Sequence, residues 1–163
     1  MRAVLAVLTV AALSAACSIP KHLDADAAPP DPFNPAATQL LDNTSWELTG
    51  WTQAGGAARA VPHGDNGEPI TLMLSTANGQ RHASGFSGCN RYTGTYMLQD
   101  GKLGFGPLAS TRMACAGARG ELEGAYLDAL AHIDRTGVQM RAPQQLQLIV
   151  ANGNTLVFTR RGQ

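Results

Sequence analysis

The sequence predicts an α+β fold that consists mostly of antiparallel β-strands with one inserted amphipathic helix. Two observations predict this fold class. Short apolar runs that alternate with polar residues dominate the chain after residue 43, and a period of two is typical of half-buried strands. One segment, at about residues 119–133, instead repeats its apolar residues with the spacing of a helix face. We therefore expect a partly barrel-like sheet that is interrupted once by this helix.

The N-terminus has the pattern of a secretory signal. Met1 and Arg2 supply a positive start, and the apolar run Ala3 to Leu13 is followed by small residues before Cys17. A helix of about 11 to 16 residues rises only roughly 16 to 24 Å, whereas the hydrocarbon core of a bilayer is about 30 Å thick. We therefore interpret residues 1–16 as a cleaved signal peptide.

The position of Cys17 directly after small residues resembles the lipobox of bacterial lipoproteins, in which this cysteine is acylated. Ser14 stands where the lipobox usually has leucine, and Leu13 lies one place early. The alternative is ordinary signal cleavage that leaves Cys17 free. Two or more acyl chains give stable membrane anchoring, so the expected partner of acylated Cys17 is membrane lipid. Ser18 resembles the sorting pattern for the outer membrane, which predicts a cell-envelope protein that faces the periplasm.

Residues 17–43 are expected to form a tether, because prolines are frequent there and no apolar periodicity appears. Residues 44–161 then form one domain, which is long enough to bury a core. The whole chain has 12 Lys and Arg residues against 12 Asp and Glu residues. This balance gives no reason to expect nucleic-acid binding.

Turn residues divide the domain into strands. Asp100-Gly101 and the region of Asn152-Gly153 each separate two alternating runs, and such pairs favour the tight turns of antiparallel hairpins. The expected strands are 45–53, 70–75, 92–99, 102–105, 145–151 and 155–159. In the first of these, Trp46, Leu48 and Gly50 are expected to share one side.

The helix is predicted by apolar residues at positions i, i+3, i+4, i+7, i+8 and i+11, counted from Leu122 to Ile133. Glu121 and Glu123 lie in its first turn, and Gly137 lies just beyond its expected end. The apolar phases of the strands and the helix predict one shared core. Its expected members are Trp46, Leu72, Phe105, Tyr126, Leu130, Leu148 and Phe158.

Cysteine use predicts one disulfide. If Cys17 carries lipid, Cys89 and Cys115 remain as an even pair in an oxidising compartment. The alternatives for Cys89 are a buried free thiol and a catalytic nucleophile. A nucleophile needs a base within hydrogen-bond reach, and only His82 is near Cys89 in the sequence.

The central sequence from Phe86 to Leu130, FSGCNRYTGTYMLQDGKLGFGPLASTRMACAGARGELEGAYLDAL, resembles the META domain of HslJ-like bacterial lipoproteins. The motifs TSWEL near the start and LVF near the end match the family's opening and closing strands. The resemblance implies a small antiparallel, partly barrel-like fold with an inserted helix and no established catalytic activity. It also implies roles in heat-shock and novobiocin-resistance phenotypes. META domains have been compared with the pilot lipoproteins that assist secretins.

The family's CNR and TRM positions correspond to Asn90, Arg91, Thr111 and Arg112, which are candidates for binding or for architecture. Asp128 and His132 share a helix face, but two ligands without a third are usually a surface pair. No catalytic residues, metal ligands or cofactor are therefore expected.

The sequence thus favours a lipid-anchored envelope module that is not an enzyme. We expect it to bind an unknown envelope protein or small ligand and to support tolerance to heat or to an antibiotic such as novobiocin. The alternatives are a pilot-like assembly factor for an envelope complex and a small envelope enzyme.

Overall fold

The computed structural model describes residues 31–64 and 66–162. Cys17, the expected signal peptide and most of the expected tether lie outside the described residues. Among the residues described, no helix has both the length and the apolar character needed to cross a bilayer.

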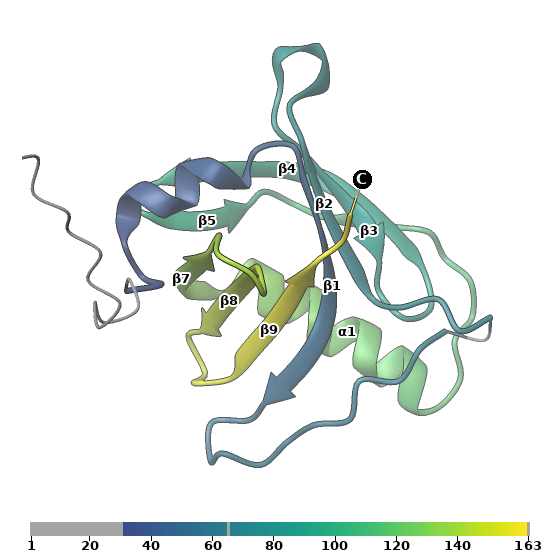
Figure 1. The fold of residues 1–163 in the computed structure, drawn as a ribbon. Coiled ribbons are helices and arrows are strands. Elements are labelled where there is room, and N and C mark those ends of the chain that lie inside the picture. The colour runs from purple at the N-terminus through teal and green to yellow at the C-terminus, as the bar shows by residue number, and fades with distance from the viewer. Residues whose placement is uncertain (1–30, 65, 163) are drawn as a thin grey trace, which may run out of the picture.

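Strands form most of the regular secondary structure in the described chain (Figure 1). Within residues 31–64 and 66–162 the α-helix is α1 (Ala118–Ala131), and the 3₁₀ helices are η1 (Pro35–Leu41) and η2 (Ala77–Gly79). The strands are β1 (Thr44–Thr52), β2 (Thr71–Ser75), β3 (His82–Phe86), β4 (Arg91–Gln99), β5 (Lys102–Phe105), β6 (Ala109–Ser110), β7 (Ile133–Gln139), β8 (Gln145–Val150) and β9 (Thr155–Arg160).

The strands form one antiparallel sheet that is nearly closed into a barrel. Its order is β5-β4-β3-β2-β1-β9-β8-β7, and β6 pairs with β4 beside this path. The two end strands meet where the backbone N–H of Leu103 donates to Oγ1 of Thr136 at 2.9 Å. Figure 1 shows η1 beside this junction, at the ends of β5 and β7. The predicted α+β class with a mostly antiparallel, barrel-like sheet is confirmed.

Both predicted hairpins are present. β4 pairs with β5, so that Leu98 faces Leu103, and β8 pairs with β9. Asp100 and Gly101 have positive φ values of 53° and 72°, which is the backbone that a two-residue hairpin turn requires. The dipeptide therefore sets the register of β4 against β5.

A bulge changes the expected alternation in β1. The pairing of β1 with β9 shifts between Leu48 and Gly50, and one extra residue moves the following side chains to the other face. Trp51 is consequently buried, with 3% of its surface exposed, and Gly50 is not the residue that continues the core face.

The helix ends earlier than the sequence predicts. α1 stops at Ala131, Ile133 begins β7, and Gly137 lies inside that strand. A Cβ at Gly137 would lie 3.1 Å from the ring of Phe33. Gly137 therefore does not stop a helix but makes room for the Phe33 ring. The close approach of a neighbour is a common reason for glycine in a strand.

The predicted core is present. Trp46, Leu72, Tyr126, Leu130, Leu148 and Phe158 are buried together, and Phe105 is partly buried against them. The Tyr126 ring on α1 contacts Tyr92 of β4 and Phe158 of β9, with ring centroids 5.8 and 6.5 Å apart. Because three other strands separate β4 from β9 in the sheet, the helix packs against the enclosed side of the sheet.

The folded chain begins before residue 44, where the sequence places the domain boundary. Thr38 and Leu41 of η1 are fully buried, and the carbonyl of Pro32 accepts a 2.6 Å hydrogen bond from the N–H of Val138 in β7. After η1, Asp42 accepts hydrogen bonds from both Arg81 and Tyr96. The last part of the expected tether is therefore part of the fold.

Candidate functional site

The site begins with the turn between β3 and β4. The backbone N–H and the hydroxyl of Ser87 both donate to the carbonyl of Asn90, at 2.9 and 2.7 Å. Gly88 between them has a φ of +98°, which side chains other than glycine rarely allow. The SGCN sequence is therefore a tight turn, and Cys89 lies within it.

The side chain of Asn90 connects this turn to two other segments. Its Nδ2 donates to Oε2 of Glu123 on α1 at 2.8 Å and to the carbonyl of Met113 at 3.3 Å. Its Oδ1 accepts from the hydroxyl of Thr111 and from the N–H of Met113, both at 2.9 Å. Only 4% of Asn90 is exposed. Since buried amides need such partners, Asn90 has an architectural role.

Cys89 and Cys115 are joined as a disulfide in the structure, with their Cα atoms 6.2 Å apart. This Cα separation lies within the range that disulfides span, about 4.4 to 6.8 Å. The bond ties the β3–β4 turn to the loop that leads into α1. Both cysteines are partly buried.

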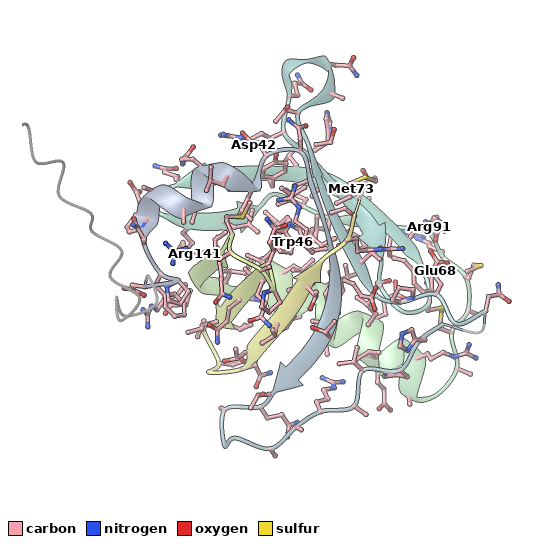
Figure 2. All side chains as sticks on the ribbon, viewed as in Figure 1. Asp42, Trp46, Glu68, Met73, Arg91 and Arg141 are labelled. Atoms are coloured by element: carbon pink, nitrogen blue, oxygen red, sulfur yellow. A yellow bond between two sulfur atoms is a disulfide. The ribbon has the colours of Figure 1, made fainter. Side chains whose placement is uncertain are left out.

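The remaining motif residues differ in their environments. Thr111 forms two hydrogen bonds with the backbone of Arg91. Its N–H donates to the Arg91 carbonyl at 2.9 Å, and its side-chain Oγ1 accepts from the Arg91 N–H at 3.2 Å. The Arg91 guanidinium forms a 2.8 Å ion pair with Glu68 but is 69% exposed. Figure 2 shows these two side chains next to each other. Arg112 is exposed and has no hydrogen bond or ion pair within residues 31–64 and 66–162.

A pocket of about 690 Å³ lies beside the disulfide. Phe86, Gly88 and both disulfide cysteines supply its apolar surface, and Glu68, Arg91 and Arg119 bring charge to it. The complete lining is Gly64, Asn66, Glu68, Phe86, Gly88, Cys89, Arg91, Thr111, Met113, Ala114, Cys115, Ala116 and Arg119. Pockets that combine apolar walls with a few polar groups are typical of ligand sites.

Two buried tyrosines, Tyr92 and Tyr126, contact each other in the core behind this site. Tyr92 donates to the carbonyl of Thr71 at 2.8 Å, and its hydroxyl lies 3.0 Å from that of Tyr126. Burial raises the pKa of Tyr92 well above its ordinary value, and burial likewise raises the pKa of Tyr126. Both phenols therefore stay neutral at physiological pH.

The histidines that the enzyme alternative would need lie elsewhere. His63, His82 and His132 are exposed, and none of them lines the pocket. His132 pairs with Asp128 at 3.2 Å on the surface of the molecule, as the i, i+4 spacing predicts. His22 lies outside the described residues.

Two residues of the site are not among the predicted candidates. Glu123 carries a signal that could have identified it, because it shares a helix face with Tyr126 and Leu130, which lie three and seven residues later and are buried. A carboxylate within an apolar face needs a partner, and that partner is Asn90. Glu68 lies in a loop, and nothing in its sequence context marks it.

A second hollow, of about 530 Å³, lies where η1 meets the β4–β5 turn and β7, and none of the predicted site residues lines it. Of the predicted site residues, Cys89, Arg91, Thr111 and Cys115 line the pocket beside the disulfide, whereas Asn90 and Arg112 do not.

Comparisons with known proteins agree with this fold. The model of the META domain family matches residues 39–163. An NMR structure of a protein from Burkholderia xenovorans is 69% identical with a TM-score of 0.75, and the match covers 89% of this chain and 100% of that chain. A second NMR structure is 27% identical with a TM-score of 0.51, over 75% of this chain and 92% of that chain. No curated protein matches the chain. The chain therefore belongs to the META domain family.

Proposed function

We propose that this protein is a lipid-anchored envelope module that is not an enzyme. It uses the pocket beside Cys89 and Cys115 to bind an envelope protein or a small ligand, and it supports tolerance to heat or to an antibiotic such as novobiocin. Acylated Cys17 holds the domain at the outer membrane, on the periplasmic side.

The observation that carries this proposal is the composition of the pocket. Ten of its lining residues come from the segment between Phe86 and Leu130 that carries the family resemblance. Its cysteines are bonded to each other, and the carboxylate of Glu68 is paired with Arg91. Such groups offer an apolar surface together with an Arg91–Glu68 ion pair, which suits the binding of a partner more than bond cleavage.

The exposed apolar side chains give less support to the pilot-like alternative. Such a factor needs one open apolar groove for a lipid or a helix. Met73, Met97 and Met113 are 48%, 49% and 63% exposed, but they line three separate pockets. Each methionine is therefore an isolated exposed side chain and not part of one groove.

Genetic complementation with an anchor variant tests the proposal. A strain that lacks the protein is expected to lose tolerance to heat or novobiocin, and the wild-type protein restores it. Cys17→Ser is expected to release a folded domain into the soluble periplasmic fraction and to fail to restore tolerance, because the pocket no longer stays near its membrane-bound partner. A deletion strain without any sensitivity to heat, novobiocin or detergent would contradict the proposal.

A further inference from the structure

Three potential metal ligands gather next to the pocket, which two of them line. The Sγ atoms of Cys89 and Cys115 and a carboxylate oxygen of Glu123 all lie within 4.8 Å of one another. Oε2 of Glu123 is 3.8 Å from the sulfur of Cys115. The three residues come from the β3–β4 turn, the loop before α1 and α1 itself, so the fold and not local sequence brings them together.

The distance between Cys115 and Glu123 matches that between two ligands of a zinc ion. Zinc binds cysteine sulfur at about 2.3 Å and carboxylate oxygen at about 2.0 to 2.2 Å in a tetrahedron. Two ligands of one zinc ion are then separated by about 3.6 to 3.8 Å. The spacing between Cys115 and Glu123 already has this value. Once the disulfide is reduced, the two sulfurs are free to separate to the same distance.

Asn90 is placed to support such a site. Its Nδ2 donates to Oε2 of Glu123 at 2.8 Å and lies 3.4 Å from the sulfur of Cys115 and 3.6 Å from that of Cys89. Because Oδ1 is fixed by Thr111 and Met113, the amide cannot turn its oxygen towards the ligands. Hydrogen bonds from outer residues to metal ligands orient them and strengthen metal binding.

We propose that the reduced form of this protein binds one Zn²⁺ ion through Cys89, Cys115 and Glu123. Both cysteines line the pocket, so the fourth coordination position opens to it, where water or the polar group of a ligand binds. Three protein ligands with one open position form a complete zinc site. This proposal does not depend on the pocket being the binding site for a partner.

The disulfide must be reduced before zinc can bind. A dithiol reductant supplies two electrons and two protons to the disulfide, which gives two thiols and the disulfide of the reductant. Zinc then binds the two thiolates, and the two thiol protons are released to water. Without a cation, two thiolates and a carboxylate would place three negative charges together in a partly buried site. In the oxidised protein neither Cys89 nor Cys115 offers a thiolate, so the site does not form.

Zinc uptake by the reduced protein tests the proposal. The protein is prepared with Cys17→Ser, so that Cys89 and Cys115 are its only thiols, and is titrated with Zn²⁺ against a competing chelator. We expect one zinc ion per reduced chain, none per oxidised chain, and none after Cys89→Ser. Co²⁺ in place of Zn²⁺ is expected to give the near-ultraviolet absorption of a cobalt–thiolate bond.

Glu123→Gln distinguishes this site from two thiols that bind zinc without the third ligand. Glutamine still accepts from Asn90, so the variant is expected to fold, while its affinity for zinc falls at least tenfold. Glu121→Gln, on the exposed side of the same helix turn, is expected to leave the affinity unchanged. Equal zinc affinities of the wild type and Glu123→Gln would overturn the proposal, as would equal uptake by the reduced and oxidised proteins. If reduction unfolds the chain, zinc must restore the dispersed amide NMR spectrum, and failure to do so also overturns it.

Discussion

The side-chain amide of Asn90 donates to the carboxylate of Glu123 at 2.8 Å, and this contact joins the β3–β4 turn to α1. The same amide group reaches Thr111 and Met113. Two of the predicted motif residues, Asn90 and Thr111, therefore have an architectural role. Arg91 and Arg112 extend into solvent, where they are available to a partner.

The first prediction concerns the side chain of Asn90. Asn90→Asp keeps the oxygen that accepts from Thr111 and Met113 but replaces the donor to Glu123 with a second carboxylate. The free energy of unfolding is expected to fall by at least about 2 kcal/mol at pH 7, because a buried donor is lost and two negative charges meet. Urea unfolding measures this change. Arg112→Ala serves as the control and is expected to change stability by less than about 0.5 kcal/mol; equal stabilities of wild type and Asn90→Asp would exclude the architectural role.

The second prediction is a pH dependence at Asp42. The hydrogen bonds from the Arg81 guanidinium hold the pKa of Asp42 below its ordinary value. A lowered pKa in the folded state stabilises the protein above the unfolded value, about 3.9, and this stability is lost as the pH falls through the folded value.

Asp42→Asn tests this dependence, because asparagine still accepts from Tyr96 but carries no charge. The side chains of Asp42 and Arg81 are 27% and 36% exposed, so we expect a loss of about 1 kcal/mol at pH 7. The melting temperatures of wild type and variant should converge as the pH falls below about 4. A gap that stays constant down to pH 2.5 would mean that the charge of Asp42 contributes nothing.

The third prediction concerns the docking of α1. Leu130 is 1% exposed and packs in the core. Leu130→Ala is expected to lower the free energy of unfolding by about 2 to 5 kcal/mol, because a cavity adds to the lost transfer free energy. Chemical denaturation followed by tryptophan fluorescence provides the value. A loss below about 0.5 kcal/mol would contradict a docked helix.

Local patterns explain how much of the fold could be predicted. Period-two alternation and the Asp100-Gly101 turn identify the β4–β5 hairpin, because both act between neighbouring residues. The bulge after Leu48 and the role of Gly137 could not be predicted in this way. Each depends on a partner far along the chain, which is β9 for the bulge and Phe33 for the glycine.

The residues of the site could also be predicted only in part. The family motifs identify Cys89, Asn90 and Thr111, which the structure brings together. They also include Arg112, whose exposed side chain forms no hydrogen bond or ion pair with the other described residues. The partner of Asn90 lies 33 residues away on a helix. Hydrogen bonds across such distances are decided by tertiary packing, so the motif alone could not name Glu123.

The fourth prediction is that the protein isolated from the cell envelope carries the Cys89–Cys115 bond. Alkylation under non-reducing denaturing conditions is expected to modify neither cysteine. The double variant Cys89→Ala, Cys115→Ala is expected to lose about 3 to 4 kcal/mol of stability, since the bond closes a loop of about 26 residues. Full alkylation of both thiols in the freshly isolated protein would contradict an oxidised envelope form.

The central claim is that the pocket beside the disulfide binds the partner or ligand through which the protein supports tolerance. A substitution of Arg91 tests this claim most directly. Arg91 lines the pocket, and its ion pair is exposed, so Arg91→Ala is expected to change stability by less than about 1 kcal/mol. Arg141 is also an exposed arginine, and Figure 2 shows it on the opposite side of the molecule from Arg91. The measurement is survival of the deletion strain under heat and novobiocin when each variant is expressed at the wild-type level. We expect Arg91→Ala to fail to restore survival while Arg141→Ala restores it; full restoration by both variants would contradict the claim.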